Sequence, residues 1–324
     1  MKVITCFSYK GGAGRTTAAA NIAAALASVS AEGSIDVPLG RKTALIDLDM
    51  FSAGTHRVFE IDNKQIENFS KTNRCIQDYL CQQVSPAEYA SRDGITPDHA
   101  LMDYFSSMRG GKTCCHSEFT LFPARADPDT KFVVQKLHEN LLLSLLIELE
   151  KKSPPFDYVI LDGESGTRQM AEIGLRLADI ILVFFRLTWQ HVEGTLKAVK
   201  KWQENPKFKP VYLIPTCVPL IDDGDNVYQK EAPGLADLRS ATRRIPELSE
   251  LDAYARSHWK DAGHFWADVS GAANRLCIHE SLCLKGEERI IVFDENAKND
   301  RAAHELYKIA AEIDKICQPP VPPE

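Results

Sequence analysis

A glycine-rich segment near the start of the chain contains the residue types that bind phosphate. It reads Ser8-Tyr9-Lys10-Gly11-Gly12-Ala13-Gly14-Arg15-Thr16-Thr17. Glycines allow a sharp turn in which successive backbone N–H groups point inward at an anion. The Thr16 hydroxyl is a suitable ligand for Mg²⁺, and the Thr17 hydroxyl can donate to a phosphate. The segment predicts a phosphate site, against the alternative of a glycine-rich turn that binds nothing.

The flanking residues supply the elements that such a loop needs. The apolar run Val3–Phe7 favours a strand before the loop, and the alanine-rich run Ala18–Ala27 favours a helix after it. We expect that helix to run from Thr16 to Ser28. Its N-terminus would add a partial positive charge beside the loop, which attracts anions.

Two positions depart from the standard phosphate-loop pattern G-x-x-x-x-G-K-[ST]. Tyr9 stands at the first glycine and Arg15 at the lysine. Lys10 followed by Gly11–Gly14 nevertheless resembles the deviant Walker A motif, K-G-G-x-G-K-[ST]-[ST], of the ParA/MinD ATPases. In that family the early lysine, matched here by Lys10, reaches the nucleotide of a partner subunit. Arginine keeps the charge of the second lysine and can bind phosphate through two N–H groups.

Two further apolar runs end in acidic residues. The run Thr43–Asp49 ends with Asp47 and Asp49, and the run Phe156–Asp162 ends with Asp162. In open α/β sheets, ligands bind at the carboxyl ends of the parallel strands. Each acid on its own is compatible with a solvated loop end, but beside a phosphate loop the pattern favours a ligand site.

The ParA/MinD resemblance implies a role for each of these acids. Asp49 would orient or activate the attacking water, Asp47 would lie near the metal and its waters, and Asp162 would hold Mg²⁺ through water. The implied cofactors are ATP and Mg²⁺, with Thr16 as a metal ligand. The implied nucleotide contacts are Gly11, Gly12, Ala13, Gly14, Arg15, Thr16, Thr17, Gly166 at the γ-phosphate, and Thr216 and Ile278 at the adenine ring.

The segment Phe51–Arg57 resembles a sub-group of these ATPases with an A-P-G-x-H-R-like sequence. Members of that sub-group also tend to carry arginine in the phosphate loop, so we interpret Arg15 as a trait of the sub-group. For His56 and Arg57 two alternatives remain open. They contact phosphate or a partner subunit, or they belong to a solvated loop end.

The alternation of apolar runs and helical patterns predicts an α/β fold, a mostly parallel twisted sheet with helices on both faces. We expect one ATPase domain over residues 1–317, with variable stretches at 58–118 and 219–275 and a proline-rich tail at 318–324. The remaining expected elements are strands Phe119–Ala124, Ala178–Phe185, Val211–Thr216 and Arg275–Ser281, and helices Asp127–Lys152, Gln190–Trp202 and one capped by Asn299 or Asp300.

Composition excludes several classes of protein. The chain has 324 residues, of which 44% are apolar, enough for a sizeable core. A net charge of −7 argues against a constitutively basic nucleic-acid surface. The nine cysteines form no C-x-x-C pair and predict free thiols in a reducing cytosol. The chain opens directly on a strand, and no apolar run reaches the roughly 18 residues of a membrane span, so we expect a cytoplasmic protein without a membrane partner.

The function implied by the resemblance is an ATP-dependent dimerising switch with slow, Mg²⁺-dependent ATP hydrolysis that acts on a partner protein. A nucleotide-binding regulatory subunit without significant hydrolysis is the alternative, because Arg15 replaces the usual lysine. Basic residues from Arg239 to Lys260 suggest non-specific DNA binding, but acids interleave with them. That pattern is more typical of a solvated helix surface, so DNA is the less favoured partner.

Overall fold

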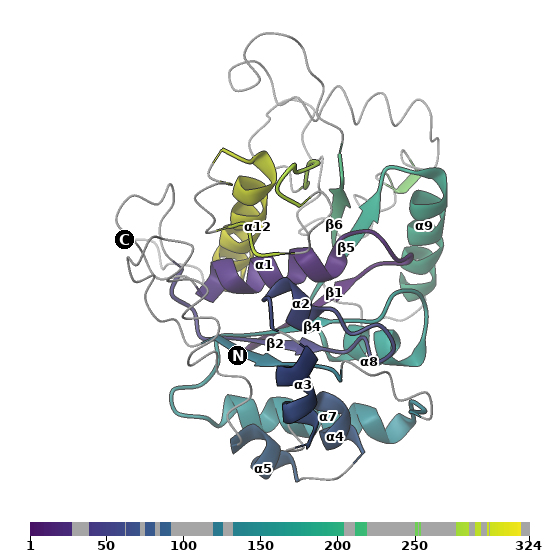
Figure 1. The fold of residues 1–324 in the computed structure, drawn as a ribbon. Helices are drawn as coiled ribbons and strands as arrows, with labels where there is room; N and C mark the ends of the chain where they lie inside the picture. Colours follow the sequence, from purple (N-terminus) through teal and green to yellow (C-terminus); the bar gives the residue numbers. More distant parts are fainter. Residues whose placement is uncertain are drawn as a thin grey trace, which may run out of the picture.

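The computed structural model describes residues 1–27, 39–61, 63–71, 75–81, 85–91, 119–125, 132–203, 211–218, 250–251, 253, 277–284, 289–292, 297 and 299–318. Their strands form one parallel sheet in the order β3-β2-β4-β1-β5-β6 (Figure 1). This confirms the predicted α/β fold. The strands are β1 (Lys2–Phe7), β2 (Thr43–Asp47), β3 (Phe119–Phe122), β4 (Tyr158–Asp162), β5 (Ile180–Arg186) and β6 (Val211–Thr216).

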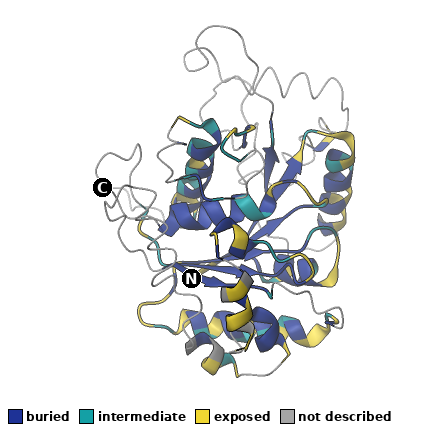
Figure 2. Ribbon diagram, in the orientation of Figure 1, coloured by how far each residue is buried: buried dark blue, intermediate teal, exposed yellow. Residues whose placement is uncertain are grey.

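Helices cover both faces of the sheet and produce three layers. One face packs against α1 (Arg15–Ala27) and α12 (Arg301–Cys317), which lie side by side in Figure 1. The other face packs against α7 (Lys136–Glu150), α8 (Gln169–Leu177) and α9 (Trp189–Gln203). Figure 2 shows the buried sheet between these layers. Among the described helices, none combines the length and the apolar character needed to cross a bilayer.

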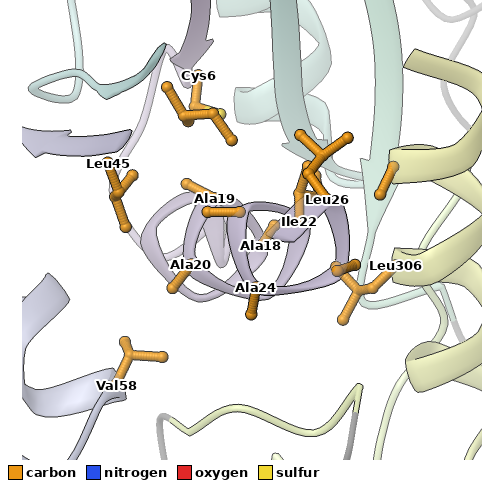
Figure 3. Close-up of a cluster of buried hydrophobic side chains, with 14 of the residues drawn as sticks. Cys6, Ala18, Ala19, Ala20, Ile22, Ala24, Leu26, Leu45, Val58 and Leu306 are labelled. Atoms are coloured by element: carbon orange, nitrogen blue, oxygen red, sulfur yellow. The ribbon is translucent and has the colours of Figure 1, made fainter. Parts of the chain in front are cut away.

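Helix α1 packs closely because most of its side chains are small. Its alanines Ala18, Ala19, Ala20 and Ala24 are buried among β-strand side chains and α12, with Leu306 of α12 at one side (Figure 3). Small side chains let the helix backbone approach the sheet, and this places the N-terminus of α1 directly at the strand ends.

The stretch after β2 contains more regular structure than its polar sequence indicated. Short helices α2 (Thr55–Val58), α3 (Asn63–Lys71), α4 (Ile76–Leu80) and α5 (Pro86–Ser91) lie within the described part of 58–118 and its approach. His56 is buried in α2 and so does not belong to a solvated loop end, whereas Arg57 is exposed.

Several predicted boundaries are corrected. The helix expected over Asp127–Lys152 corresponds to α7, which begins at Lys136, and residues 132–135 before it are not helical. On α7, Leu137 is exposed, whereas Leu142 and Leu146 are buried. At the other end of the chain, α12 starts after its N-cap Asp300 as predicted, but Ile316 is exposed. Within 277–281, the strand expected at Arg275–Ser281 reduces to a bridge between His279 and Val218.

Asn21 links α1 to a distant part of the chain. Its side-chain amide donates to the carbonyl oxygens of Thr17 (2.9 Å) and Arg289 (3.0 Å), and its oxygen accepts from the backbone N–H of Ile291 (2.7 Å). The side chain is fully buried. A buried amide whose partners are all backbone groups holds both segments in one register.

We predict that Asn21→Ala lowers the free energy of unfolding by about 2 to 4 kcal/mol, because buried backbone groups of 289–292 would lose their partner. The measurement is equilibrium unfolding in urea. Asn140→Ala is the matched control, since Asn140 is an exposed residue inside helix α7, and it should change stability by less than about 0.5 kcal/mol. Equal effects of the two variants would show that the Asn21 amide does not hold the segment.

Candidate functional site

Three strand ends meet at one edge of the sheet. Asp47, the last residue of β2, lies in register with Asp162, the last residue of β4, and Cys6 of β1 also pairs with Asp162. The glycine-rich loop follows β1 directly, so both acidic strand ends and the loop occupy the same carboxyl edge. The sequence prediction that these motifs converge is therefore realised in the fold.

The loop has the backbone conformation that its glycines permit. Gly12 and Gly14 adopt positive φ angles of 76° and 71°, a region that side-chain-bearing residues rarely enter. Gly166, with φ 85°, donates its N–H to the carbonyl oxygen of Ser8 at 2.9 Å, so the turn after β4 is fastened to the loop. Helix α1 begins at Arg15, and its first N–H groups have no acceptor inside the helix. These donors and their dipole suit an anion.

Strand β6 and the segment at 277–280 lie next to the loop. The Thr216 hydroxyl donates to the carbonyl oxygen of Ala13 at 2.7 Å. Ile278 donates its N–H to the carbonyl oxygen of Pro215, the neighbour of Thr216, at 2.9 Å. Thr216 and Ile278, the two residues that the family resemblance assigned to a base, are thus brought together beside the loop.

Arg15 lies among the acids at the sheet edge. Its Nε donates to Oδ1 of Asp162 at 2.6 Å, and its Nη2 donates to Oδ2 of Asp49 at 3.2 Å and to the Thr16 hydroxyl at 3.3 Å. The residue is 6% exposed, whereas Gly11 and Gly14 of the loop are exposed. Burial raises the pKa of Asp162, and the charge of Arg15 offsets part of that rise.

Asp47 and Asp49 have different surroundings although only Leu48 separates them. Oδ2 of Asp47 accepts from the Thr55 hydroxyl at 2.6 Å and from the backbone N–H groups of Gly54 and Thr55, and its Oδ1 accepts from the Asp49 N–H. Burial nevertheless raises the pKa of Asp47 to about 7. Asp47, predicted as a metal residue, uses its oxygens to hold the loop that carries Asp49.

The side chains of Lys10 and Tyr9 both contact helix α9. The Lys10 ammonium is exposed and donates to the side-chain oxygen of Gln190 at 3.4 Å, which places it away from the acids that hold Arg15. Tyr9 packs on Gly194, where any Cβ would overlap the tyrosine ring. The absence of a side chain at Gly194 therefore fixes the position of the loop segment that carries Lys10.

The residues around Asp162 fit a bound Mg²⁺. The second oxygen of Asp162, Oδ2, is buried and has no hydrogen-bond partner in the described part of the chain. Arg15 bonds both Asp162 and the Thr16 hydroxyl, so this hydroxyl lies close to the carboxylate. A buried carboxylate oxygen and a threonine hydroxyl are hard oxygen ligands of the kind that Mg²⁺ prefers. Asp162 and Thr16 are therefore the better candidates for direct contact with the metal. Asp47 is the candidate for holding the loop beside the metal in position, because its oxygens accept from that loop.

The sequence patterns assigned no role to Glu164, which is a fourth acid at this edge after Asp47, Asp49 and Asp162. Glu164 is 3% exposed, pairs with Arg168, and has a raised pKa because it is buried. The Arg168 guanidinium also lies over the ring of Phe51, 5.5 Å from its centroid. Arg168 thereby connects the loop after β2 with the loop after β4. The sequence signal that could have identified Glu164 is the presence of a carboxylate inside the turn Gly163–Gly166.

A second cluster lies between the segment 277–280 and α12. His279 Nδ1 and Glu305 Oε1 are 2.6 Å apart, and Cys277 Sγ is 3.8 Å from His279 Nδ1. Arg301 donates to the same Glu305 oxygen at 2.9 Å, and the His279 N–H occupies the other. Both oxygens of the Glu305 carboxylate are already used by these hydrogen bonds. The cluster therefore holds α12 against the segment of His279, which forms the bridge with Val218.

A glycine-rich loop at a helix N-terminus, beside two acidic strand ends on a parallel sheet, defines the P-loop class of nucleotide-binding proteins. A family model described as "AAA domain" matches residues 1–210. The chain therefore belongs to this family. No curated protein matches the sequence.

Solved structures share the fold over nearly the whole chain. MinD cell division protein from Aquifex aeolicus has a TM-score of 0.59 at 18% identity and covers 100% of both chains. A variant of McdA from Cyanothece, in complex with ATP, has a TM-score of 0.56 at 13% identity and covers 99% of this chain and 98% of its own. A putative plasmid partition protein from Borrelia burgdorferi, bound to AMPPNP, has a TM-score of 0.56 at 17% identity, with 97% and 98% covered. The ParA/MinD resemblance is confirmed at the level of family and fold.

We predict that Gly194→Ala displaces Tyr9 and the Lys10 segment, and lowers the free energy of unfolding by about 1 to 3 kcal/mol through overpacking. Faster hydrogen exchange at the amides of residues 9–12 would locate the change. Gly174→Ala in α8 is the control, because a Cβ there meets its nearest atom, Thr5 Cγ2, at an ordinary 3.5 Å. If both variants exchange like the unmodified protein, Gly194 does not position the loop.

Proposed function

We propose that this protein is an ATP-dependent dimerising switch that hydrolyses ATP slowly with Mg²⁺ and acts on a partner protein. The observation that carries the proposal is the convergence of the glycine loop, Arg15, Asp49 and Asp162 at one sheet edge. Among the related solved structures, MinD from Pyrococcus horikoshii is a complex with Mg-ADP, the McdA variant a complex with ATP, and the partition protein is bound to AMPPNP. These nucleotides support the choice of ATP as the ligand.

The nucleotide would bind along the loop and the N-terminus of α1. The backbone of Gly11–Gly14 and the first turn of α1 would hold the phosphates, and Gly166 would face the γ-phosphate. The base would lie toward Thr216 and Ile278, which the hydrogen bonds to Ala13 and Pro215 place at the far side of the loop. Thr16 and Thr17 would supply hydroxyl groups to the metal and to a phosphate.

We assign different roles in phosphoryl transfer to Asp49 and Asp162 because their side chains differ in exposure to solvent. The Asp49 side chain is 12% exposed and that of Asp162 is 0% exposed. Asp49 is therefore the acid that can position a water molecule, and Asp162 the one that can support the cation. When bound, Mg²⁺ would neutralise charge that develops on the phosphate oxygens. Arg15 and Lys10 of a second copy would add positive charge to the same transferring group.

A second copy of the chain and an unidentified partner protein are the proposed partners, and the cytoplasm is the proposed location. Lys10 is exposed beside the loop, as a residue that reaches into another subunit must be. Non-specific DNA remains the less favoured partner. The basic residues considered for it, from Arg239 to Lys260, lie outside the described residues.

One observation favours the alternative, a regulatory subunit that binds nucleotide without significant turnover. Arg15 is engaged with Asp49 and Asp162, the two residues on which hydrolysis would depend. If the guanidinium kept this position with nucleotide bound, each Asp49 oxygen would already accept one hydrogen bond, Oδ2 from Arg15 and Oδ1 from the Ser52 N–H at 2.9 Å. Fewer lone pairs would then be available to position a water molecule.

The first test is solution mass by light scattering in Mg²⁺ with no nucleotide, with ADP, or with a slowly hydrolysed ATP analogue. We expect a dimer only with the triphosphate analogue. Lys10→Ala should retain nucleotide binding by the monomer and weaken the dimer by about tenfold or more, because one cross-subunit charge contact is lost. Lys197→Ala, at an exposed lysine of α9 paired with Glu193, is the control. One mass in all three states would contradict the switch.

The second test is phosphate release. We predict that Asp49→Ala slows release by about 100-fold or more at unchanged nucleotide affinity, because the water would lose its positioning carboxylate. Fluorescent nucleotide binding is measured alongside, to separate turnover from affinity. Equal, slow release by the variant and the unmodified protein would favour the regulatory subunit.

A further inference from the structure

The Arg15 guanidinium lies among the very groups that would surround a metal ion. It contacts Asp162 Oδ1 (2.6 Å), Asp49 Oδ2 (3.2 Å), the Thr16 hydroxyl (3.3 Å) and the Ser8 hydroxyl (3.5 Å). These are two carboxylates and two hydroxyls, all oxygen donors. A divalent cation bound at Asp162 Oδ2, which has no hydrogen-bond partner in the described part of the chain, would lie beside the guanidinium on Oδ1, and the two positive charges would repel one another.

The position of Arg15 also differs from the one expected of a phosphate-binding side chain. Gly11, Gly12 and Gly14 expose the loop backbone on the outer side, whereas Arg15 is 6% exposed and directed at the strand ends. The guanidinium therefore faces the acids. To reach a phosphate held by the loop, it must leave Asp162 and Asp49.

We propose that Arg15 is the resting counter-ion of the Asp49–Asp162 pair, and that it excludes divalent cations until a triphosphate accepts the guanidinium. This rests on the proposed function, since it names the order in which that site fills. A cation arriving alone would leave a nearly buried guanidinium without an anionic partner, which is strongly unfavourable. A triphosphate supplies oxygens that match the guanidinium fork, so Arg15 can move only when nucleotide binds.

Arginine suits this task better than the lysine of the related motif. The Nε and Nη2 atoms of Arg15 bond to different acids, so one side chain bridges Asp162 and Asp49. An ammonium group is a compact point charge without this planar fork. The arginine in the loop therefore makes the exclusion of metal tighter, and metal and nucleotide should enter together.

The test uses Mn²⁺ as the probe, with free Mn²⁺ measured by electron paramagnetic resonance. The nucleotide-free protein should bind Mn²⁺ at least about 100-fold more weakly than the protein with a slowly hydrolysed ATP analogue, after correction for Mn²⁺ bound by the analogue itself. Equal Mn²⁺ affinity with and without the analogue would overturn the proposal. This comparison needs no variant, so it holds even if Arg15 cannot be replaced without loss of folding.

Variants assign the effect to Arg15. Arg15→Gln should raise the Mn²⁺ affinity of the nucleotide-free protein by about tenfold or more, and Arg15→Lys by less. Adding Asp162→Asn to Arg15→Gln should remove the gain, which places the new site at the strand ends. Lys10→Ala removes one positive charge from the same loop but contacts neither acid, and it should leave nucleotide-free Mn²⁺ affinity unchanged. A gain in Lys10→Ala equal to that in Arg15→Gln would show a general charge effect and overturn the proposal.

Failure of the proposed function gives a different result. If the protein binds no ATP analogue, fluorescence titration shows this directly, and the proposed function fails. The gain in nucleotide-free Mn²⁺ affinity on replacing Arg15 is measured without nucleotide and still decides whether the guanidinium excludes the cation.

Discussion

The buried ion pair between Arg15 and Asp162 joins two layers of the fold at the functional edge. Arg15 is the first residue of α1, and Asp162 is the last residue of β4. Asp162 is completely buried and would be an unpaired charge without a nearby cation. The start of α1 is therefore held against the sheet by charge as well as by the apolar packing of its alanines. The loop between β1 and α1 must close over this pair.

Hydrogen bonds between neighbouring loops and strand ends hold the loops around the Arg15–Asp162 pair. Asp47 collects N–H groups from the loop after β2, Ser8 accepts the N–H of Gly166, and Ala13 accepts the Thr216 hydroxyl. Each of these bonds joins a loop to a different strand end. Such fastening reduces the conformational freedom that a ligand would otherwise have to remove on binding.

If nucleotide binds as proposed, Arg15 has two alternative sets of partners, the acids at the strand ends and a phosphate on the loop. The guanidinium cannot contact both sets at once. The phosphate-binding role expected from the motif and the acid-bridging position in the fold would then be two states of one side chain. Arg168, which pairs with Glu164 and lies over Phe51, connects the two neighbouring loops that would sense such a change.

Much of the architecture and most of the candidate site followed from the sequence alone. Apolar runs that end in Asp47 and Asp162, and a glycine loop before an alanine-rich segment, determine local structure because strand and helix periodicity and glycine conformation act over a few residues. The boundary of α7 and its buried face did not follow, since Leu137 and Leu142 are equally apolar and only packing against the sheet selects one. The ion pair of Arg15 with Asp162 and the contact of Tyr9 with Gly194 join residues far apart in the chain. The bonds of Asp47 and Glu164 are local, but their burial comes from the packing of the whole sheet edge. The sequence by itself determined which groups reach the sheet edge, and the tertiary structure decided which of them touch, because hydrogen bonds and ion pairs depend on distances that only the folded chain defines.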